Sequence, residues 1–344
     1  MDTLTDSDPT QLGPIRLLGR LGSGGMGQVY LGQTEDGERV AAKMIGLSYQ
    51  DNPEIRARFT REAQAMGMVQ GPGTAALIAH SGPDIDAPWL AMEYVPGLDL
   101  NQYVRRDAPL EPRDAIALTF LLAEALADIH QVGLLHRDLK PGNVMLGPHG
   151  PQVIDFGLVA IGAPGGEHTA SHQLLGTVQY MAPEQVHSVK DVTAAADVYA
   201  LGPLLLFATT GRYPYPGQYH QALYAVGNPD IAPDLTGLPE ELTSLVTALM
   251  AYDPAERPDL GELRIQLSQR LAAAGLSPSA ARNQLARRTY IPDPEEDKDT
   301  APTAIPTTRA MSPEPRTIPA GPAAAGMAAA AARMRTAYAP AVSW

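Results

Sequence analysis

A change of sequence pattern near residues 93–97 restricts the chain to few architectures. Before it, short runs that alternate apolar and polar residues predict strands, interrupted by one helical pattern. After it, longer patterns with helical spacing predict a series of helices. The predicted strands are 15–21, 29–33, 39–45 and 89–94, and the predicted helices are 53–69, 112–131, 194–210, 239–250 and 259–274. A strand-rich part followed by a helix-rich part favours an α+β fold with two lobes.

Composition narrows the classes of function and the cellular setting. The 344 residues carry a formal net charge of −13, which argues against a general nucleic-acid or membrane-surface binder, because both partners are anionic. The chain has no cysteine, which excludes disulfides, cysteine-ligated metals and thiol nucleophiles and fits a reducing cytosol. We see neither a signal-peptide pattern nor a run of about 20 strongly apolar residues, so we expect no membrane span and a cytoplasmic location.

The composition also divides the chain into three zones. Residues 1–11 form a polar leader, and residues 12–274 are expected to form one domain, with a first lobe at about 12–93, a hinge at 93–97 and a second lobe at 98–274. Residues 275–344 are rich in Ala and Pro, and their repeated prolines interrupt helices and strands. We therefore expect the third zone to be mostly disordered and dispensable for catalysis, with the alternative that residues 264–285 extend a terminal helix.

A glycine-rich motif, Gly22-Ser23-Gly24-Gly25-Met26-Gly27, directly precedes the strand that begins near Val29. In a dinucleotide-binding fold such a motif should open a helix instead. The glycines are therefore expected in a hairpin, where a backbone without Cβ atoms can lie over phosphate groups. For this motif alone, an ordinary glycine-rich hairpin is an equally good explanation.

A lysine and a glutamate are candidates for a buried ion pair. Strand periodicity places Ala41 and Lys43 on one face. A single lysine at a strand end usually faces water, but Glu62 shares its helix face with Phe59 and Met66. A carboxylate among apolar residues is costly unless it is paired. We therefore predict an ion pair between Lys43 and Glu62.

The most specific motif is His136-Arg137-Asp138-Leu139-Lys140-Pro141-Gly142-Asn143. Asp155-Phe156-Gly157 begins twelve residues after Asn143. Such residues could occur by chance in a polar loop, but this order at this spacing is not a plausible accident.

Together these motifs resemble those of the Hanks-type protein kinases, in particular the bacterial serine/threonine kinases, over residues 15 to about 270. The resemblance implies the two-lobed protein kinase fold, with a small β-rich N-lobe containing one regulatory helix and a larger helical C-lobe. It also identifies Gly176–Glu184 as the end of an activation segment. Asp197 is the implied brace of the catalytic loop, and Arg257 is the implied partner of Glu184.

The resemblance implies a catalytic role for four residues. Lys43, held by Glu62, contacts the α- and β-phosphates of ATP. Asp138 accepts or orients the proton of the substrate hydroxyl, and Lys140 neutralises the phosphoryl group in transfer.

ATP and Mg²⁺, with Mn²⁺ as an alternative metal, are the implied cosubstrate and cofactor. Asn143 and Asp155 would supply the hard oxygen ligands that magnesium prefers. Met92 would stand behind the adenine, and the backbone of Glu93 and Val95 would bond its edge. The full set expected to bind nucleotide is Leu21, Gly22, Gly24, Gly27, Val29, Ala41, Lys43, Met92, Glu93 and Val95.

The resemblance also implies the substrate class, because Lys140 and Thr177 are typical of serine/threonine rather than tyrosine specificity. The expected partners are ATP and protein substrates, including a second copy of the chain in a transient homodimer that phosphorylates itself in trans. Two alternatives remain open, a nucleotide-binding pseudokinase that acts as a scaffold and a small-molecule phosphotransferase. The intact Lys43, Asp138, Asn143 and Asp155 weigh against the first, and the complete set of motifs weighs against the second.

Regulation is predicted in the Gly- and Pro-rich segment between Asp155 and Glu184. Arg137 directly precedes the catalytic aspartate and needs an anionic partner, which a phosphate on this segment would provide. We favour Thr169 first and Ser171 second as the phosphorylated residue. Thr177 is expected to make a structural contact with the catalytic loop instead. The alternative is an ordered loop whose hydroxyl groups have no regulatory role.

Overall fold

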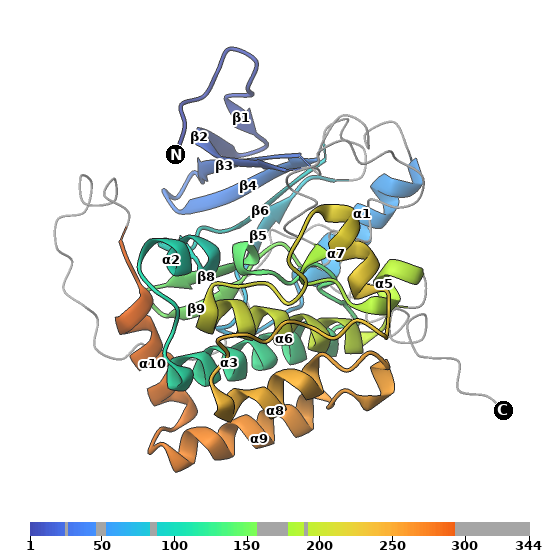
Figure 1. Ribbon diagram of the computed structural model, residues 1–344. Coiled ribbons are helices and arrows are strands. Elements are labelled where there is room, and N and C mark those ends of the chain that lie inside the picture. Colours follow the sequence, from blue (N-terminus) through green and yellow to red (C-terminus); the bar gives the residue numbers. More distant parts are fainter. Residues whose placement is uncertain (25–26, 46–52, 83–87, 157–177, 189–191, 293–344) are drawn as a thin grey trace. The chain divides into compact units, whose positions relative to one another are not determined.

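Six strands form an antiparallel sheet in the N-terminal part of the chain (Figure 1). Their order is β1-β2-β3-β4-β6-β5, and a helix, α1 (Pro53–Met66), follows β4 in the chain. The strands are β1 (Gln11–Leu12), β2 (Ile15–Gly24), β3 (Gly27–Gln33), β4 (Arg39–Ile45), β5 (Leu77–His80) and β6 (Trp89–Glu93). The four predicted strands and the predicted helix are confirmed, whereas β1 and β5 were not predicted.

The structure is a computed structural model that describes residues 1–24, 27–45, 53–82, 88–156, 178–188 and 192–292. Residues 1–291 form one folded unit. Most of the tail that the sequence predicts to be disordered, 293–344, lies outside the described residues.

One face of the sheet carries the apolar core of this part of the chain. Ile15, Tyr30, Val40, Ala42 and Ala91 are buried together there. Alternate residues along a strand point to opposite faces, so Ala41 and Lys43 lie on the other face. The period-two pattern of the sequence therefore specifies which side of the sheet is free to carry polar groups.

The first eleven residues belong to the folded unit and are not a separate leader. The backbones of Asp2 and Arg20 exchange two hydrogen bonds, of 3.0 and 2.8 Å. The Asp8 carboxylate receives hydrogen bonds from the Arg20 guanidinium at 2.7 and 2.8 Å and from the Tyr30 hydroxyl at 2.9 Å. Arg20 is the main reason that the pKa of Asp8 lies well below its usual value. The expected domain start at residue 12 therefore differs from the structure, because these polar side chains are satisfied by the sheet.

Helices dominate the remainder of the described chain. They are α2 (Leu100–Arg106), α3 (Pro112–Gln131), α5 (Pro183–His187), α6 (Ala194–Thr210), α7 (Tyr219–Val226), α8 (Glu240–Leu249), α9 (Leu260–Ala273) and α10 (Pro278–Thr289), with 3-10 turns η2 (Pro141–Asn143) and η4 (Pro254–Glu256). A three-stranded sheet, β7-β8-β9, lies among them, with β7 (Leu98–Asp99), β8 (Val144–Gly147) and β9 (Gly150–Val153). The predicted α+β organisation is confirmed.

Local sequence signals explain where the central helices begin and end. Pro112 opens α3, where proline's missing N–H costs nothing. The Thr193 hydroxyl caps the start of α6, and Gly211 ends it with φ +68°, a conformation that favours glycine. Nearly all side chains in the middle of α3 and α6 are buried, so these two helices form the core of the helical part. Within the described residues, no helix is both long enough and apolar enough to cross a membrane.

The last described helix, α10, lies beyond the expected domain boundary at residue 274. It contacts α3, β8 and β9, and Ala281, Leu285 and Ala286 are buried (Figure 1). Ser277 caps its start and Pro278 occupies the first turn. The folded unit ends after Ile291 rather than after residue 274, because a short, Ala-rich helix buries a few residues against an existing surface.

Candidate functional site

The strand register gathers four of the predicted nucleotide-binding residues on one face of the sheet. Val29 lies opposite Lys43, and Ala41 lies opposite Met92. Directly opposed residues of antiparallel strands point to the same side. The four side chains therefore share the face opposite the apolar core, and the prediction for Ala41 and Lys43 is confirmed.

The glycine-rich motif forms a hairpin, as predicted. The β2–β3 pairing extends from Gly22 opposite Val29 to Gly24 opposite Gly27. Gly27 has φ +143°, which L-residues rarely adopt. A Cβ at Gly22 would meet no atom within 4 Å, and Leu21 is 38% exposed. The hairpin thus has a bare backbone and an accessible apolar side chain beside it, while residues 25–26 lie outside the described part.

The chain that leaves β6 carries backbone groups suited to an adenine edge. Met92 and Val95 are buried. The Glu93 N–H donates to the Ala76 carbonyl at 2.7 Å, so an adenine would have to use the Glu93 carbonyl. Within the described residues, no hydrogen bond engages the N–H or C=O of Val95. These groups fit the predicted contacts, which remain a proposal.

Lys43 forms a long-range ion pair with Asp155. The Lys43 ammonium lies 2.9 Å from Asp155 Oδ2, and the two side chains are 10% and 32% exposed. Burial disfavours the charged carboxylate, but the positive charge and hydrogen bond of Lys43 outweigh it and lower the pKa of Asp155. Glu62 is buried, as its place among apolar residues predicts. The structure pairs Lys43 with Asp155, so the predicted pair with Glu62 is left as a proposal.

The loop before η2 holds Asp138 in a fixed position. Lys140 Nζ donates to Asp138 Oδ2 at 2.7 Å. Asn143 Nδ2 donates to the Asp138 backbone carbonyl at 2.8 Å and to Oδ2 at 3.3 Å. The other carboxylate oxygen, Oδ1, is shielded from solvent and has no hydrogen-bond partner among the described residues. Asp138 therefore has one oxygen that is held by Lys140 and Asn143 and one buried oxygen that lacks a partner among the described residues.

Asn143 and Asp155 are brought together by the β8–β9 hairpin. Asn143 precedes β8, Asp155 follows β9, and Val144 pairs with Val153. The Ile154 N–H donates to the Asn143 carbonyl at 3.0 Å and closes the open end of the hairpin. Because the Asn143 amide nitrogen bonds Asp138, its oxygen remains available as a ligand.

This pair of oxygen donors fits a magnesium ion that also binds phosphate. Magnesium commonly takes one or two protein oxygens and completes its shell with water and substrate phosphates. Within the described residues, no three His, Asp or Glu side chains are grouped to hold a metal by themselves. The two donors are Asn143 and Asp155, with the carboxylate at present paired to Lys43.

Two non-glycine residues of this region adopt the left-handed backbone conformation. Arg137 has φ +64° and Asp155 has φ +59°. Such conformations cost about 1–3 kcal/mol and persist only when surrounding contacts impose them. Strain at both residues indicates that the two loops are held in a required geometry.

Asp197, at the start of α6, supplies part of that restraint. Its carboxylate accepts hydrogen bonds from the backbone N–H of His136 and of Arg137, both at 2.8 Å. His130 Nε2 lies 2.7 Å from Oδ2. Burial opposes ionisation, but the hydrogen bond and charge of His130 outweigh it and lower the pKa of Asp197. The predicted brace is confirmed, and His130 is a supporting residue that the sequence analysis missed.

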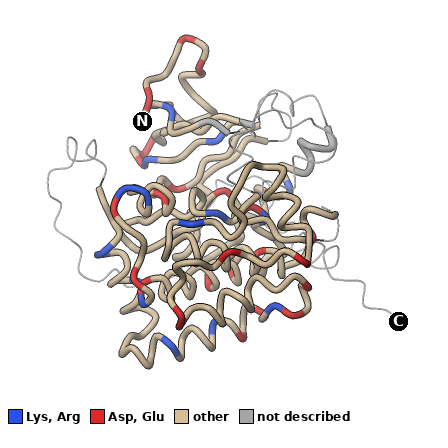
Figure 2. The backbone as a smooth tube through the Cα atoms, viewed as in Figure 1, with Lys and Arg blue, Asp and Glu red and all other residues tan. Residues whose placement is uncertain are grey.

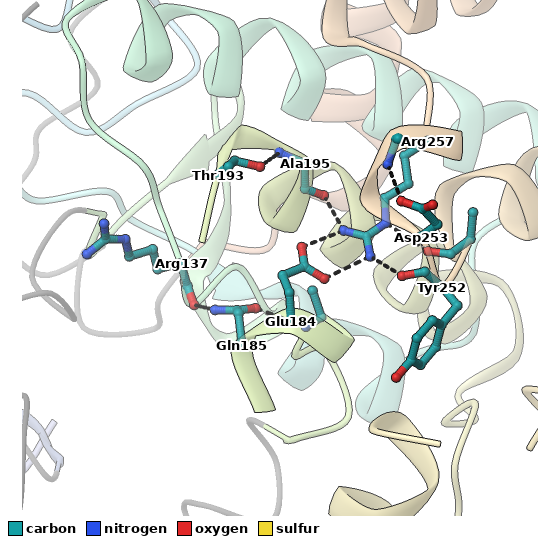
Figure 3. Close-up of polar contacts among 11 residues, drawn as sticks. Arg137, Glu184, Gln185, Thr193, Ala195, Tyr252, Asp253 and Arg257 are labelled. Atoms are coloured by element: carbon teal, nitrogen blue, oxygen red, sulfur yellow. Dashed lines mark hydrogen bonds and ion pairs between the residues drawn. The ribbon is translucent and has the colours of Figure 1, made fainter. Parts of the chain in front are cut away.

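A buried ion pair anchors the start of α5 (Figure 3). The Arg257 guanidinium bonds both oxygens of Glu184, at 2.7 and 2.8 Å. It also donates to the carbonyls of Ala195, Ala251 and Tyr252. The predicted Glu184–Arg257 pair is confirmed. Gln185, which was not predicted, links this segment to the loop of Asp138, and no periodicity or motif in the sequence marks that contact.

The predicted regulatory hydroxyls, those of Thr169, Ser171 and Thr177, lie outside the described residues, as does Gly157. Arg137 is described, and its Nε atom is buried without a hydrogen-bond partner among the described residues.

Acidic and basic positions are interspersed along the described backbone (Figure 2).

Comparison with known proteins gives a consistent family assignment. The protein-family model described as "Protein kinase domain" matches residues 15–266 of this chain. Serine/threonine-protein kinase AfsK of Streptomyces coelicolor is 41% identical over 276 residues, which cover 80% of this chain and 34% of AfsK. The probable serine/threonine-protein kinase PkwA of Thermomonospora curvata is 41% identical over 269 residues, covering 78% of this chain and 36% of PkwA. The chain thus spans about a third of the length of these relatives.

A solved structure agrees at the level of the fold. The PknI kinase domain of Mycobacterium tuberculosis superposes with a TM-score of 0.61 and 27% sequence identity. The superposition covers 78% of this chain and the whole of that domain.

Proposed function

Because the chain belongs to the protein kinase family and has its two-lobed fold, we propose that it transfers the γ-phosphoryl group of ATP to Ser and Thr hydroxyls of proteins. The observation that carries this proposal is the different environment of the two carboxylate oxygens of Asp138. One of its oxygens is held by Lys140, while Oδ1 is shielded and lacks a partner among the described residues. That arrangement suits acceptance of a proton from an incoming hydroxyl.

The proposed reaction follows from these positions. A substrate hydroxyl oxygen attacks the γ-phosphorus, its proton passes to Asp138 Oδ1, and the bond to the β-phosphate oxygen breaks to release ADP. Lys140, at 2.7 Å from Asp138, is close enough to offset charge on the phosphoryl group in transfer. Asp197 and the hairpin of β8 and β9 fix the loops so that little reorganisation is required.

Nucleotide binding would rearrange one contact. Lys43 and Asp155 now neutralise each other. When ATP binds, Lys43 would turn to the α- and β-phosphates, and Asp155 with Asn143 would hold Mg²⁺, with Mn²⁺ as an alternative. The metal would supply positive charge that offsets the negative charge of the phosphates. Glu62, buried on α1, is the residue proposed to receive Lys43 in that state.

We propose that the adenine lies against the sheet face formed by Val29, Ala41 and Met92. Leu21 and the glycines at 22, 24 and 27 would cover the ring and the phosphates from the hairpin. The Glu93 carbonyl and both backbone groups of Val95 would bond the adenine edge. The shared face and the unengaged Val95 groups support this placement.

Regulation by phosphorylation remains part of the proposal. The buried Arg137 Nε without a partner among the described residues supports a demand for an anion. We propose Thr169, then Ser171, as the modified residue, with Thr177 in a structural contact. Reaction in trans within a transient homodimer would deliver the phosphate. The names of the relatives support serine/threonine specificity, and the ATP requirement and absence of cysteine are in keeping with a cytoplasmic reaction.

Labelled ATP tests the proposal against its alternatives. The purified chain is incubated with γ-labelled ATP, Mg²⁺ and casein, and acid hydrolysis identifies the labelled residues. Label on Ser and Thr, absent from Asp138→Asn, is the expected result. ATP binding without transfer would indicate a nucleotide-binding scaffold, and transfer confined to small molecules would indicate a phosphotransferase of another class.

A further inference from the structure

Gln185 connects the start of α5 with the loop that carries Asp138 (Figure 3). Its side-chain oxygen, Oε1, accepts a hydrogen bond from the Ala182 N–H at 2.9 Å. Its side-chain nitrogen, Nε2, donates to the Arg137 backbone carbonyl at 2.9 Å. One amide thus caps its own helix and also reaches a residue 48 positions away in the chain.

The carbonyl that Gln185 contacts belongs to the peptide group directly before Asp138. The N–H of Arg137 is held by Asp197 Oδ1 at 2.8 Å, and Arg137 has φ +64°. The strained residue is therefore held from both sides, by α6 at its N–H and by α5 at its C=O. Because a peptide group is planar, fixing the Arg137 carbonyl also fixes the direction of the Asp138 N–H.

Among the described residues, the Asp138 backbone has two other restraints. Asn143 Nδ2 donates to the Asp138 carbonyl at 2.8 Å, but on the N-terminal side of the residue the Asp138 N–H donates to His136 Nδ1 at 3.3 Å, which is long for a hydrogen bond. The Gln185 bond is shorter, at 2.9 Å. The backbone that carries Gln185 is also anchored. Arg257, whose side chain is fully buried, binds both carboxylate oxygens of the neighbouring Glu184.

We propose that Gln185 is a positioning residue for Asp138, which couples the placement of α5 to the orientation of the catalytic carboxylate. The inference rests on the proposed kinase activity. It predicts a loss in kcat, because the bond acts on the catalytic aspartate and touches none of the groups proposed to bind ATP. Loss of one neutral hydrogen bond together with a small misplacement of the reacting group corresponds to about a 10- to 100-fold fall.

The chain provides a matched control on another helix. Gln221, in the first turn of α7, accepts from the Gln218 N–H at 2.9 Å, just as Gln185 accepts from the Ala182 N–H. In the part of the chain that the structure describes, the side-chain nitrogen of Gln221 has no partner. A Gln→Glu change at either position keeps the capping acceptor, and a negative charge is favourable at a helix start. Only at Gln185 does it remove a donor to the catalytic loop.

The experiment compares Gln185→Glu, Gln185→Met and Gln221→Glu with wild type by steady-state kinetics and thermal unfolding. Gln185→Met removes the donor without adding a charge beside Arg137, and it also removes the acceptor for the Ala182 N–H. Both Gln185 variants should therefore show the same fall in kcat, with a lowered Tm expected for Gln185→Met alone. We expect kcat about 10- to 100-fold below wild type, an unchanged KM for ATP and an unchanged Tm of Gln185→Glu. Gln221→Glu should match wild type in all three.

Other outcomes overturn the inference. Gln185 variants with kcat within twofold of Gln221→Glu would show that the bond does not position Asp138. A rise in KM for ATP at constant kcat, or a fall in kcat that only follows a lowered Tm, would show a role in binding or in folding instead. An inactive wild type would overturn the proposed kinase activity itself. Failure of the proposed activity can thus be distinguished from failure of the inference about Gln185.

Discussion

The helix α10 should be required for the stability of the kinase domain, and replacing Leu285 with alanine tests this. Leu285 is fully buried, and Ala281 and Ala286 on the same helix are also buried. The helix contacts α3, β8 and β9, of which β8 and β9 hold the loops of Asn143 and Asp155 (Figure 1). A cavity at Leu285 would therefore lie in the packing that supports the site.

The size of the effect follows from the lost side chain. A buried Leu→Ala change costs about 2–5 kcal/mol, depending on how far the surroundings collapse. At about 2 °C per kcal/mol for a unit of this size, the Tm should fall by about 4–10 °C. Arg287→Ala is the matched control, because Arg287 is exposed on the same helix.

Thermal and chemical unfolding of the purified proteins measure these changes. We expect Arg287→Ala to unfold within about 1 °C of wild type. A chain ending at residue 291 should keep the wild-type Tm, whereas a chain ending at residue 274 should be strongly destabilised. A Leu285→Ala protein as stable as Arg287→Ala, or a chain ending at 274 with full stability, would refute the assignment of α10 to the folded unit.

Three further predictions concern the site. Asp155→Asn should abolish transfer, since an amide holds magnesium less well than a carboxylate, and should lower the Tm, because it removes the charge that pairs with the buried Lys43 ammonium; wild-type turnover at matched Mg²⁺ would contradict the role of Asp155. Lys43→Met should strongly reduce kcat while ATP still binds, and Glu62→Gln should cause a smaller loss in the same direction; a silent Glu62→Gln in both phosphorylated and unphosphorylated protein would exclude the proposed pair. Burial lowers the pKa of His136 below 6.5. As the pH falls below 6.5, the unfolded chain then binds more protons than the folded chain, so the unfolding free energy should decrease. This decrease with falling pH should be smaller in His136→Phe. Urea titrations at several pH values that give the same pH dependence for both proteins would contradict this.

Much of the fold could be predicted because its signals are local. The period-two pattern identified β2, β3, β4 and β6, and helical spacing identified the long helices. Strands such as β7 and β9 were missed because two to four residues carry too little periodicity. The sequence offered only an extension of the terminal helix over 264–285. The separate helix α10 was missed because few of its residues are apolar, and its stability depends on burial against α3, β8 and β9.

The candidate site was predictable in its residues but not in all of its contacts. Asp138, Asn143 and Asp155 stand in an ordered motif, so their proximity could be expected. The partner of Lys43 could not, because Asp155 is 112 residues away in the chain. The Gln185 contact depends on how α5 meets the catalytic loop, and no single segment of the sequence contains that information.

The most direct test of the account is the rate of the chemical step in Asp138→Asn. Single-turnover transfer from γ-labelled ATP to a protein substrate is measured with enzyme in excess, and ATP affinity is measured separately by calorimetry. Loss of the proton acceptor should slow transfer by about 10²- to 10⁴-fold, while the Kd for ATP and the Tm stay at their wild-type values. A wild-type rate constant in Asp138→Asn would contradict the claim that the unpartnered oxygen of this carboxylate accepts the substrate proton.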